Sequence, residues 1–311
     1  MSTQPAPATP VVTMRAARIH DYGAPDVIAD DVVPVPHPVP GEVLIRVAAT
    51  SFNPSEAALR SGALRHVLPL PLPYTLGWDV AGIVTEVGPG VTMFGPGDRV
   101  IARLDTGGAA AEYVAAAADL LAPAPAGLPL TDAAAIPVAA LTAWQAVHEH
   151  AEVSPGQRVL INGAGGGVGG FAVQLAKRAG ARVLATASAR SAAAIRELGA
   201  DRTIDYTAQP LPADLDAVIN LAALTPGAAS ALTPLIRPGG RLVSIATPIP
   251  APDAVHFVTR NDAAQLARIS ALVGSKHLRV DIAESRPLRD LPEIHRRSEA
   301  GLTRGKIILH P

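Results

Sequence analysis

The stretch RVLINGAGGGVGGFAVQLAKRAG, residues 158–180, decides the fold of this chain. Its first residues, 158–162, form an apolar run that predicts a strand, and residues 168–179 have the composition of a helix. The loop between them is rich in glycine, which loses more backbone freedom on folding than any other residue. Keeping so many glycines at one turn indicates that the backbone there must stay uncovered.

The glycines of this loop have a spacing with a known physical use. Gly165, Gly167 and Gly170 fit the pattern G-x-G-x-x-G, and Gly166 with Gly169 fits a second register. Glycine lets a phosphate approach the backbone, and the following helix supplies free N–H groups and the positive end of its dipole. A strand, this loop and a helix in that order predict a dinucleotide site, and the alternative is a tight turn without a ligand.

The chain around the loop alternates between strand and helix. The sequence predicts strands at 158–162, 182–186, 202–205, 216–220 and 241–245, and helices at 131–152, 168–179, 191–198, 228–236 and 262–273. Repeated strand–helix units fold into a parallel sheet covered by helices on both faces. We therefore expect an α/β protein whose second part is a Rossmann domain with a doubly wound parallel sheet.

The first part of the chain has a different sequence pattern. Val43, Ile45 and Val47 alternate with their neighbours, and the segments AGIVTEVG and DRVIARL also predict strands. Prolines at positions 34, 36, 38 and 40 exclude a helix interior there. We expect an irregular, mainly β domain from about Met14, preceded by a disordered lead over residues 1–13.

The composition excludes several classes of protein. The 311 residues are 49% hydrophobic and 17% charged, which suffices for a large core and two domains. A net charge of −1 gives no electrostatic signal for nucleic acid or an anionic membrane as a partner. The lack of cysteine rules out disulfides, thiolate nucleophiles and thiolate metal ligands. Without a signal-peptide pattern or an apolar run of about 18 residues, we expect a cytoplasmic protein with a small-molecule substrate.

The residues at the end of the second predicted strand indicate which dinucleotide the chain binds. Sheets that bind NAD usually carry an acidic residue there for the ribose 2′-hydroxyl, about 20 residues after the glycine loop. This chain has no acid from Val183 through Arg196, and Ser188 and Arg190 stand at that point instead. A hydroxyl and a guanidinium suit the 2′-phosphate of NADPH. The alternative is that Arg190 is a solvated residue at the start of a helix.

Several motifs occur in the order typical of one superfamily. They are PYTLGWDVAGIVTEVGPGVTMFGPGDRV, AAEYV, AAAIPVAALTAWQAV, VLINGAGGGVGGFAVQLAK, LGADRTIDY and GKIIL. With them the chain resembles the medium-chain dehydrogenases/reductases, and more narrowly their zinc-independent quinone oxidoreductase (zeta-crystallin-like) branch. The resemblance implies a GroES-like catalytic domain at 14–138 and 276–311, a Rossmann NADP-binding domain at 139–275, and a homodimer joined through edge strands of the cofactor sheet.

The resemblance also implies roles for single residues. It places Asn53 near the nicotinamide, and Thr142 beside the nicotinamide ring or its ribose. The alternatives are a structural turn before Pro54 and a threonine that bonds back to its own helix. The cofactor-binding positions of the branch match Gly165, Gly166, Gly167, Val168, Arg190 and Tyr206, to which the strand-end argument adds Ser188.

The zinc ligands of related alcohol dehydrogenases have no match in this chain. Those enzymes use an early cysteine, a Gly-His-Glu sequence and a four-cysteine lobe. Here Asn53 and the sequence Gly-Trp-Asp at 77–79 stand at the first two places, and no lobe occurs between residues 98 and 112. His148 and His150 lie two apart on a predicted helix and so face different ways. We therefore predict that no metal is bound.

Without a metal, the chemistry narrows to hydride transfer onto an acceptor that is already electrophilic. A quinone or an α,β-unsaturated ketone fits, oriented over the nicotinamide by binding geometry. The resemblance places pocket tyrosines at Ala58 and about Leu64, and their absence favours a proton from solvent. Tyr74 is the remaining catalytic candidate beside Asn53 and Thr142. Candidates for the pocket lining are Tyr74, Arg60, His66 and Trp78.

Two other functions stay open on the sequence alone. One is a specialised reductase or cyclase of a secondary metabolic pathway, which the missing pocket tyrosine suggests. The other is a non-catalytic protein that binds NADPH as a structural component or a sensor. Neighbouring genes would separate the first from a general quinone reductase, and tight NADPH binding without turnover would identify the second.

Overall fold

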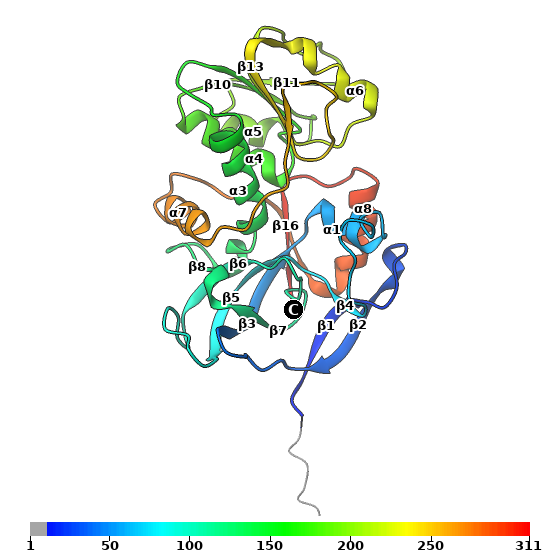
Figure 1. The fold of residues 1–311 in the computed structure, drawn as a ribbon, viewed down its shortest axis with the longest axis vertical. Helices are drawn as coiled ribbons and strands as arrows, with labels where there is room; N and C mark the ends of the chain where they lie inside the picture. The colour runs from blue at the N-terminus through cyan, green and yellow to red at the C-terminus, as the bar shows by residue number, and fades with distance from the viewer. Residues whose placement is uncertain (1–10) are drawn as a thin grey trace, which may run out of the picture.

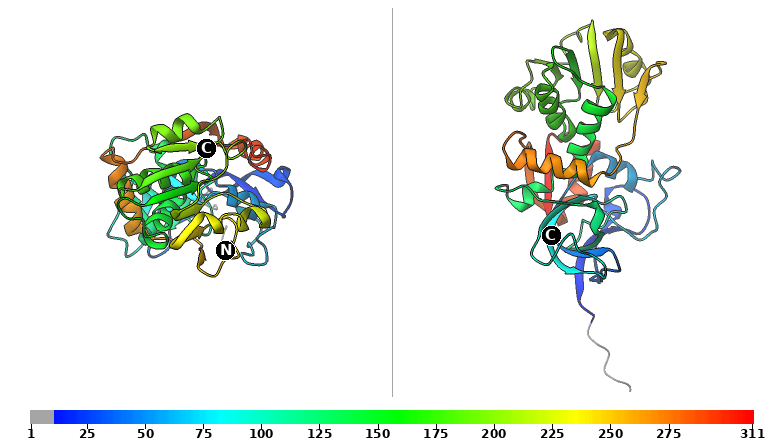
Figure 2. Two further views of the ribbon diagram at one scale, coloured as in Figure 1. Left: turned by 90° about the horizontal axis from the view of Figure 1, so that it is seen from above. Right: turned by 60° about the vertical axis from the view of Figure 1, so that its left-hand side comes forward.

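The computed structural model describes residues 11–311, which form two parts stacked along the long axis of the molecule (Figure 1). A mainly β part contains the first strands and the end of the chain, and an α/β part contains the middle. Helix α7, Ala263–Gly274, lies at the level where the two parts meet, as Figure 2 also shows. The expected lead lies outside the described residues up to residue 10, and the first strand begins at Thr13.

The β part contains two sheets. A small sheet has the strand order β2-β1-β4, and a seven-stranded sheet has the order β15-β16-β3-β5-β6-β8 with β7 paired to β3. The last strand, β16, pairs antiparallel with β3, so the end of the chain completes a sheet that the N-terminal residues begin. The strands are β1 Thr13–Ile19, β2 Ile28–Pro34, β3 Glu42–Ser51, β4 Tyr74–Thr75, β5 Asp79–Val87, β6 Arg99–Arg103, β7 Tyr113–Ala117, β8 Leu121–Pro123, β15 Ile282–Pro287 and β16 Lys306–His310.

The α/β part is the predicted doubly wound sheet, which the structure confirms. Its six strands are all parallel and have the order β11-β10-β9-β12-β13-β14. Because the order reverses direction at β9, right-handed crossovers put α4 and α5 on one face and α6 on the other (Figure 1). The elements are β9 Arg158–Asn162, α4 Gly167–Arg178, β10 Arg182–Thr186, α5 Ala192–Glu197, β11 Arg202–Ile204, β12 Leu215–Asn220, α6 Pro226–Ser230, β13 Ile236–Ser244 and β14 Ala254–His256.

One predicted helix is wrong. The helix expected at 228–236 ends at Ser230, a 3-10 turn covers Thr233–Leu235, and β13 already begins at Ile236. The segment RPGG at 237–240 lies inside β13, where Gly239 has a φ of +78°. Pairing with β12 draws this segment into the sheet with a register shift, and this tertiary pairing outweighs the local preference.

The predicted helix at 131–152 is divided into three pieces. They are α2 Leu130–Ala133, α3 Pro137–Trp144 and a π-helical turn at Gln145–His150. Pro137 explains the first break, because proline fits the first turn of a helix but not its interior. The expected domain boundary at 138/139 falls inside α3, and the domain bounds stay a proposal.

One hydrophobic cluster crosses from one part to the other. Ile101 of β6 and Ile308 of β16 belong to the same buried cluster as Leu141 of α3 and Ile161 of β9. Burial of apolar surface is favourable, so this shared core helps to hold the two parts together. Within residues 11–311, no helix has the length and apolar character needed to cross a membrane.

Candidate active site

The glycine loop joins β9 to α4 at the carboxyl edge of the parallel sheet. Helix α4 begins at Gly167, and its N-cap is Gly166, which provides no side-chain cap. A Cβ on Gly169 would lie 2.3 Å from the backbone oxygen of Ala164, and one on Gly165 would lie 2.5 Å from the Ser191 hydroxyl. A Cβ on Gly166 would meet nothing closer than 3.7 Å. Gly165 and Gly169 are therefore needed for packing, whereas Gly166 leaves open space in front of the backbone.

A buried row of hydrogen bonds holds the start of this loop. The Gly163 N–H donates to the Thr186 hydroxyl over 2.8 Å, and that hydroxyl donates to the Asn162 side-chain oxygen over 2.9 Å. The Asn162 amide donates to Asn220 over 2.8 Å, and the Asn220 amide donates to Ser244 over 2.9 Å. These residues end four neighbouring strands, so the loop has a fixed geometry before any ligand arrives.

The residues predicted to read the 2′-phosphate follow β10 and β11. Arg190 is exposed and donates to the backbone oxygen of Gly301 over 3.0 Å. Ser188 is half-buried, 3.5 Å from the Ser191 hydroxyl, and Tyr206 is 59% exposed. A cation and a hydroxyl at the end of β10, with no carboxylate between them, fit a phosphate better than a ribose diol. Their role in cofactor binding stays a proposal.

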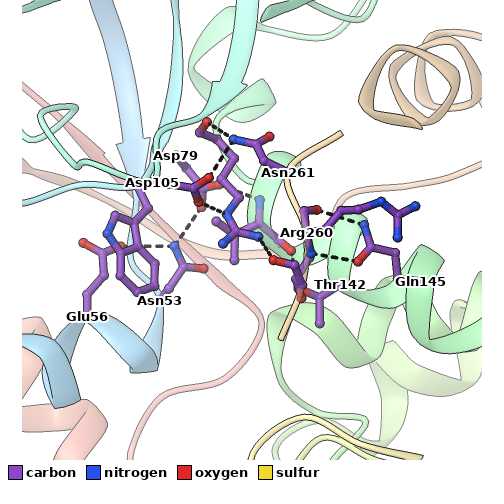
Figure 3. Close-up of polar contacts among 12 residues, drawn as sticks. Asn53, Glu56, Asp79, Asp105, Thr142, Gln145, Arg260 and Asn261 are labelled. Atoms are coloured by element: carbon purple, nitrogen blue, oxygen red, sulfur yellow. Dashed lines mark hydrogen bonds and ion pairs between the residues drawn. The ribbon is translucent and has the colours of Figure 1, made fainter. Parts of the chain in front are cut away.

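Asn53 lies between β3 and α1, Pro54–Arg60, in a buried polar network (Figure 3). Its side-chain amide nitrogen donates to an oxygen of Asp79 over 2.9 Å and to an oxygen of Glu56 over 3.1 Å. Pro54 fixes the first turn of α1, which sets the direction in which Asn53 enters the network. Both N–H groups of the Asn53 amide are thus used by protein carboxylates.

Lys306 supplies the positive charge of this network. Its ammonium donates to the Asn53 side-chain oxygen over 2.8 Å and lies 3.3 Å from an oxygen of Asp79. Asp79 also accepts from the Ser51 hydroxyl over 2.5 Å and from the Val138 N–H over 2.7 Å. The network therefore joins β3, β5 and β16 of the β part to α3 of the α/β part.

Glu56 is a fully buried carboxyl in this network. Burial raises the pKa of the Glu56 carboxyl to about 7, and the charge of Asp79 adds to the rise. Hydrogen bonds from Asn53 and the Gly77 N–H and the charge of Lys306 oppose it. A carboxyl that titrates near neutrality lies next to Asn53.

Thr142 of α3 meets a segment that follows β14. Its hydroxyl donates to the Val138 oxygen over 2.6 Å and lies 2.8 Å from the Thr259 hydroxyl (Figure 3). The bond to Val138 is the back-bonding alternative that the sequence left open. With its proton on Val138 and a partner in Thr259, the Thr142 hydroxyl offers a ligand an acceptor and no free proton.

The segment from Thr259 to Asn261 is tied to both parts of the molecule (Figure 3). On the α/β side, Gln145 exchanges two hydrogen bonds with the Arg260 backbone, over 2.9 and 3.0 Å. On the β side, the Arg103 guanidinium donates to the Thr259 oxygen over 2.7 Å, and the Asn261 amide donates to the Arg103 oxygen over 2.8 Å. This bridging segment, residues 259–261, closes one side of the junction where Thr142 lies.

Tyr74 does not join these groups. Its hydroxyl accepts a hydrogen bond from the Trp78 indole over 3.2 Å, and burial raises the pKa of Tyr74 to about 12. Tyr74 lines a cavity of about 470 Å³ in the β part that Asn53 and Thr142 do not line. A phenol that holds its proton this firmly can donate a hydrogen bond but is a weak acid.

Arg60 and His66 are the other two candidates for the pocket lining. The Arg60 guanidinium is buried and donates to the Gly23 oxygen and to Glu299, so its contacts are structural. His66 is exposed in the turns after α1.

Sequence reasoning missed Lys306, Glu56 and the bridging segment. Lys306 had one signal, because a lysine beside the apolar run of GKIIL is out of place unless it has a buried partner.

Within residues 11–311, no three histidine, aspartate or glutamate side chains come together in a way that would hold an ion. His148 packs on Trp144, with ring centroids 4.6 Å apart, and His150 packs on Phe257 at 4.1 Å. Burial lowers the pKa of both histidines. These two side chains serve packing.

Two family descriptions match the chain. The alcohol dehydrogenase GroES-like domain matches residues 39–126, which lie in the β part. The zinc-binding dehydrogenase family matches residues 198–309.

Named relatives extend over nearly the whole chain. The chloroplast envelope quinone oxidoreductase homolog of Arabidopsis thaliana is 34% identical over 96% of this chain and 98% of its own length. The NADPH-dependent alkenal/one oxidoreductase of the same plant is 31% identical over 96% of this chain and 80% of its own length. The chloroplastic quinone-oxidoreductase homolog of Spinacia oleracea is 41% identical, but the chain covers only 61% of that protein.

A solved structure agrees with these relatives. The quinone oxidoreductase of Escherichia coli, determined in complex with NADPH, superposes with a TM-score of 0.86 at 25% identity. The comparison covers 96% of this chain and all of that chain.

Proposed function

Because the chain belongs to the quinone oxidoreductase branch of the medium-chain dehydrogenase/reductase superfamily, we propose that it is a zinc-independent reductase that uses NADPH to reduce a quinone or an α,β-unsaturated ketone. Membership supports an oxidoreductase of the quinone or enone type. The names of the relatives mention quinones, alkenals and enones, and these are the acceptor classes that we carry over to this chain.

One observation carries the metal-free assignment. Asn53 and Trp78 stand where the resemblance places a cysteine and a histidine in the zinc enzymes, and Asn53 and the neighbouring Asp79 are both bonded to the buried ammonium of Lys306. A fixed positive charge between these two side chains repels a divalent cation and uses the oxygens that would bind it. The chemistry of these residues thus supports the proposal of a zinc-independent enzyme.

The residues of the loop and of the β10 end fit NADPH, the cofactor named for two of the similar proteins. The N–H groups at the start of α4, together with the open space before Gly166, suit the pyrophosphate. Ser188 and Arg190 suit the 2′-phosphate. When bound, NADPH supplies the hydride, and these residues orient it.

The contacts of Asn53, Thr142 and Tyr74 favour solvent as the source of the proton. The amide protons of Asn53 and the hydroxyl proton of Thr142 are all donated to other protein groups. Neither side chain can then donate a hydrogen bond to an oxygen that gains charge on the acceptor. Tyr74 holds its proton too firmly to act as an acid near neutral pH. Water is therefore the proton donor that we propose.

The proposal has a direct test. Purified protein is mixed with NADPH and a panel of quinones and enones, and cofactor oxidation is followed by absorbance, with NADH and with 1,10-phenanthroline in parallel. We expect turnover with at least one acceptor, a preference for NADPH and no effect of the chelator. Lack of turnover with every acceptor would count against the reductase, and inhibition by the chelator would count against the metal-free site.

We also propose a homodimer in the cytoplasm. Strand β14 lies at the edge of the six-stranded sheet, and Val258 just beyond it is 84% exposed. An uncovered edge strand invites pairing with a second copy. Sedimentation at micromolar concentration tests the dimer, and a monomer there would refute it. Cell fractionation tests the location.

A further inference from the structure

Lys306 is a buried lysine to which no function in cofactor binding has yet been given. It begins β16, and the residue is 3% exposed. Its stem lies against the first residue of α4, since a Cβ on Gly167 would come 2.4 Å from the Lys306 Cδ. The preceding residue, Gly305, donates its N–H to the Gly165 oxygen over 2.9 Å. Lys306 therefore lies directly against the glycine loop, and its charged end reaches Asn53.

The hydrogen bonds of Asn53 fix which way its amide faces. A primary amide has two N–H donors and one oxygen with two lone pairs. Both donors face carboxylates, those of Asp79 and Glu56, and the oxygen faces the Lys306 ammonium. Turning the amide over would put N–H groups against the ammonium and the oxygen against two acids, which electrostatics disfavours. One lone pair of the oxygen is left for a ligand.

We propose that Lys306 is a positioning residue, which holds the Asn53 amide so that it offers NADPH an acceptor and no donor. The matching group on the nicotinamide is the N–H₂ of its carboxamide, the hydrogen-bond donor attached to the reacting ring. The inference rests on the proposed function only in its use of a nicotinamide cofactor. It assigns to Lys306 and Asn53 together the recognition of that carboxamide.

The charge on Lys306 suits this function better than a neutral side chain would. Burying an ammonium is costly unless an opposite charge and good hydrogen bonds offset the cost, and Asp79 and the Phe52 oxygen provide both. A charged donor also forms a stronger hydrogen bond than a neutral one, so the Asn53 oxygen is held more firmly. Asp79 also accepts a hydrogen bond from the Val138 N–H, so the network that holds Asn53 reaches α3.

The test compares two cofactors that differ in one donor. The reduced 3-acetylpyridine analogue of NADPH has a methyl group in place of the carboxamide N–H₂. Dissociation constants for NADPH and for this analogue are measured by titration calorimetry with the wild-type protein and with the variants Lys306→Met, Lys306→Gln and Lys177→Met. The measured quantity is the affinity ratio of the two cofactors, which needs no turnover.

We expect the wild-type protein to bind NADPH about tenfold more tightly than the analogue, the effect of one well-placed buried hydrogen bond. Lys306→Met removes the donor to Asn53, and the ratio should fall to near one. Lys306→Gln keeps an N–H donor and should retain most of the ratio. Lys177→Met changes a lysine of similar chemistry in a surface ion pair with Asp201 and should behave as wild type.

A wild-type ratio in Lys306→Met would overturn the proposal. Thermal unfolding first shows whether each variant folds. If Lys306→Met does not fold, Asn53→Ala, which leaves the Lys306–Asp79 pair intact, and Lys306→Gln decide. The proposal requires that the affinity ratio of NADPH to the analogue falls to near one in Asn53→Ala. It also requires that Lys306→Gln keeps most of the wild-type ratio. The opposite result in either variant refutes the proposal. A protein that shows the expected ratios but reduces no acceptor would contradict the reductase function alone.

Discussion

The Thr142 hydroxyl lies 2.8 Å from the Thr259 hydroxyl, although the two residues are 117 positions apart in the chain. Thr142 belongs to α3, and Thr259 begins the bridging segment that Arg103 holds from the β part. A residue that the sequence connects with the cofactor is therefore also part of the contact between the two parts. Changes in this contact are expected to affect the position of Thr142.

Replacing Thr259 by valine tests this link. Valine keeps the shape of the side chain and removes the hydroxyl, so Thr142 loses a partner while its bond to Val138 remains. We expect the free energy of unfolding to fall by about 1 kcal/mol, and amide exchange in residues 257–262 to become faster. Chemical denaturation and hydrogen exchange measure the two effects. Thr203→Val, in strand β11, is the control, and equal exchange in both variants would contradict the link.

The glycine loop gives a matched pair of substitutions. Gly169→Ala puts a methyl group 2.3 Å from a backbone oxygen, which cannot move away as a flexible side chain could. Gly166→Ala meets nothing closer than 3.7 Å and has an ordinary extended backbone with φ −87°. We expect Gly169→Ala to lower the melting temperature by several degrees and Gly166→Ala to keep it. Gly166→Ala should weaken NADPH binding, because its methyl group stands where the phosphate approaches, and unchanged binding would argue against this site.

Arg190→Ala tests the choice of cofactor. Because Arg190 is exposed and makes one hydrogen bond to the Gly301 backbone, its loss should leave the fold intact. A charge-assisted contact to the 2′-phosphate contributes about 1.5–3 kcal/mol, so the preference for NADPH over NADH should fall by about 10-fold to 100-fold. Steady-state kinetics with both cofactors give the ratio. Arg196→Ala, also exposed, on α5, should keep the wild-type preference, and an equal fall there would point to general electrostatics.

His295 gives the fold a predictable dependence on pH. It is fully buried in α8, Leu291–Glu299, and neither ring nitrogen has a hydrogen-bond partner among the described residues. Burial, assisted by the charge of Arg60, lowers the pKa of His295 from 6.5 to about 3. Between pH 6.5 and about 3, His295 binds a proton in the unfolded chain but not in the folded chain. The free energy of unfolding therefore decreases as pH falls through this window, by up to about 1.4 kcal/mol per pH unit.

His295→Leu should remove this dependence. Leucine fills a similar volume, has no unpaired nitrogen and binds no proton, so the variant should be more stable than wild type at pH 7 and still more so at pH 4.5. Thermal unfolding between pH 4.5 and 8 measures the difference. His37→Leu, at an exposed position, is the control. A stability gap that does not widen on acidification would show that His295 accepts a proton in the fold.

Patterns within about thirty residues predicted much of this protein. The strands at 158–162 and 182–186 have the expected bounds, the doubly wound sheet is confirmed, and relatives agree with the quinone oxidoreductase branch and with NADPH. The helix predicted at 228–236 failed because a strand pairing partner, β12, is invisible to local preference. The assignment of Ser188, Arg190 and Tyr206 to the cofactor stays a prediction.

The sequence by itself determined the glycine loop, the strand–helix alternation and the lack of cysteine, because these depend on residue identity and on neighbours in the chain. Only the tertiary structure decided the chemistry of Asn53. Lys306, 253 positions away, approaches it through the pairing of β16 with β3 and donates to its side-chain oxygen, while Glu56 and Asp79 accept from its amide nitrogen. A hydrogen bond needs its two atoms within about 3 Å, and spacing along the chain does not fix that distance between strands that close a sheet from opposite ends of the protein.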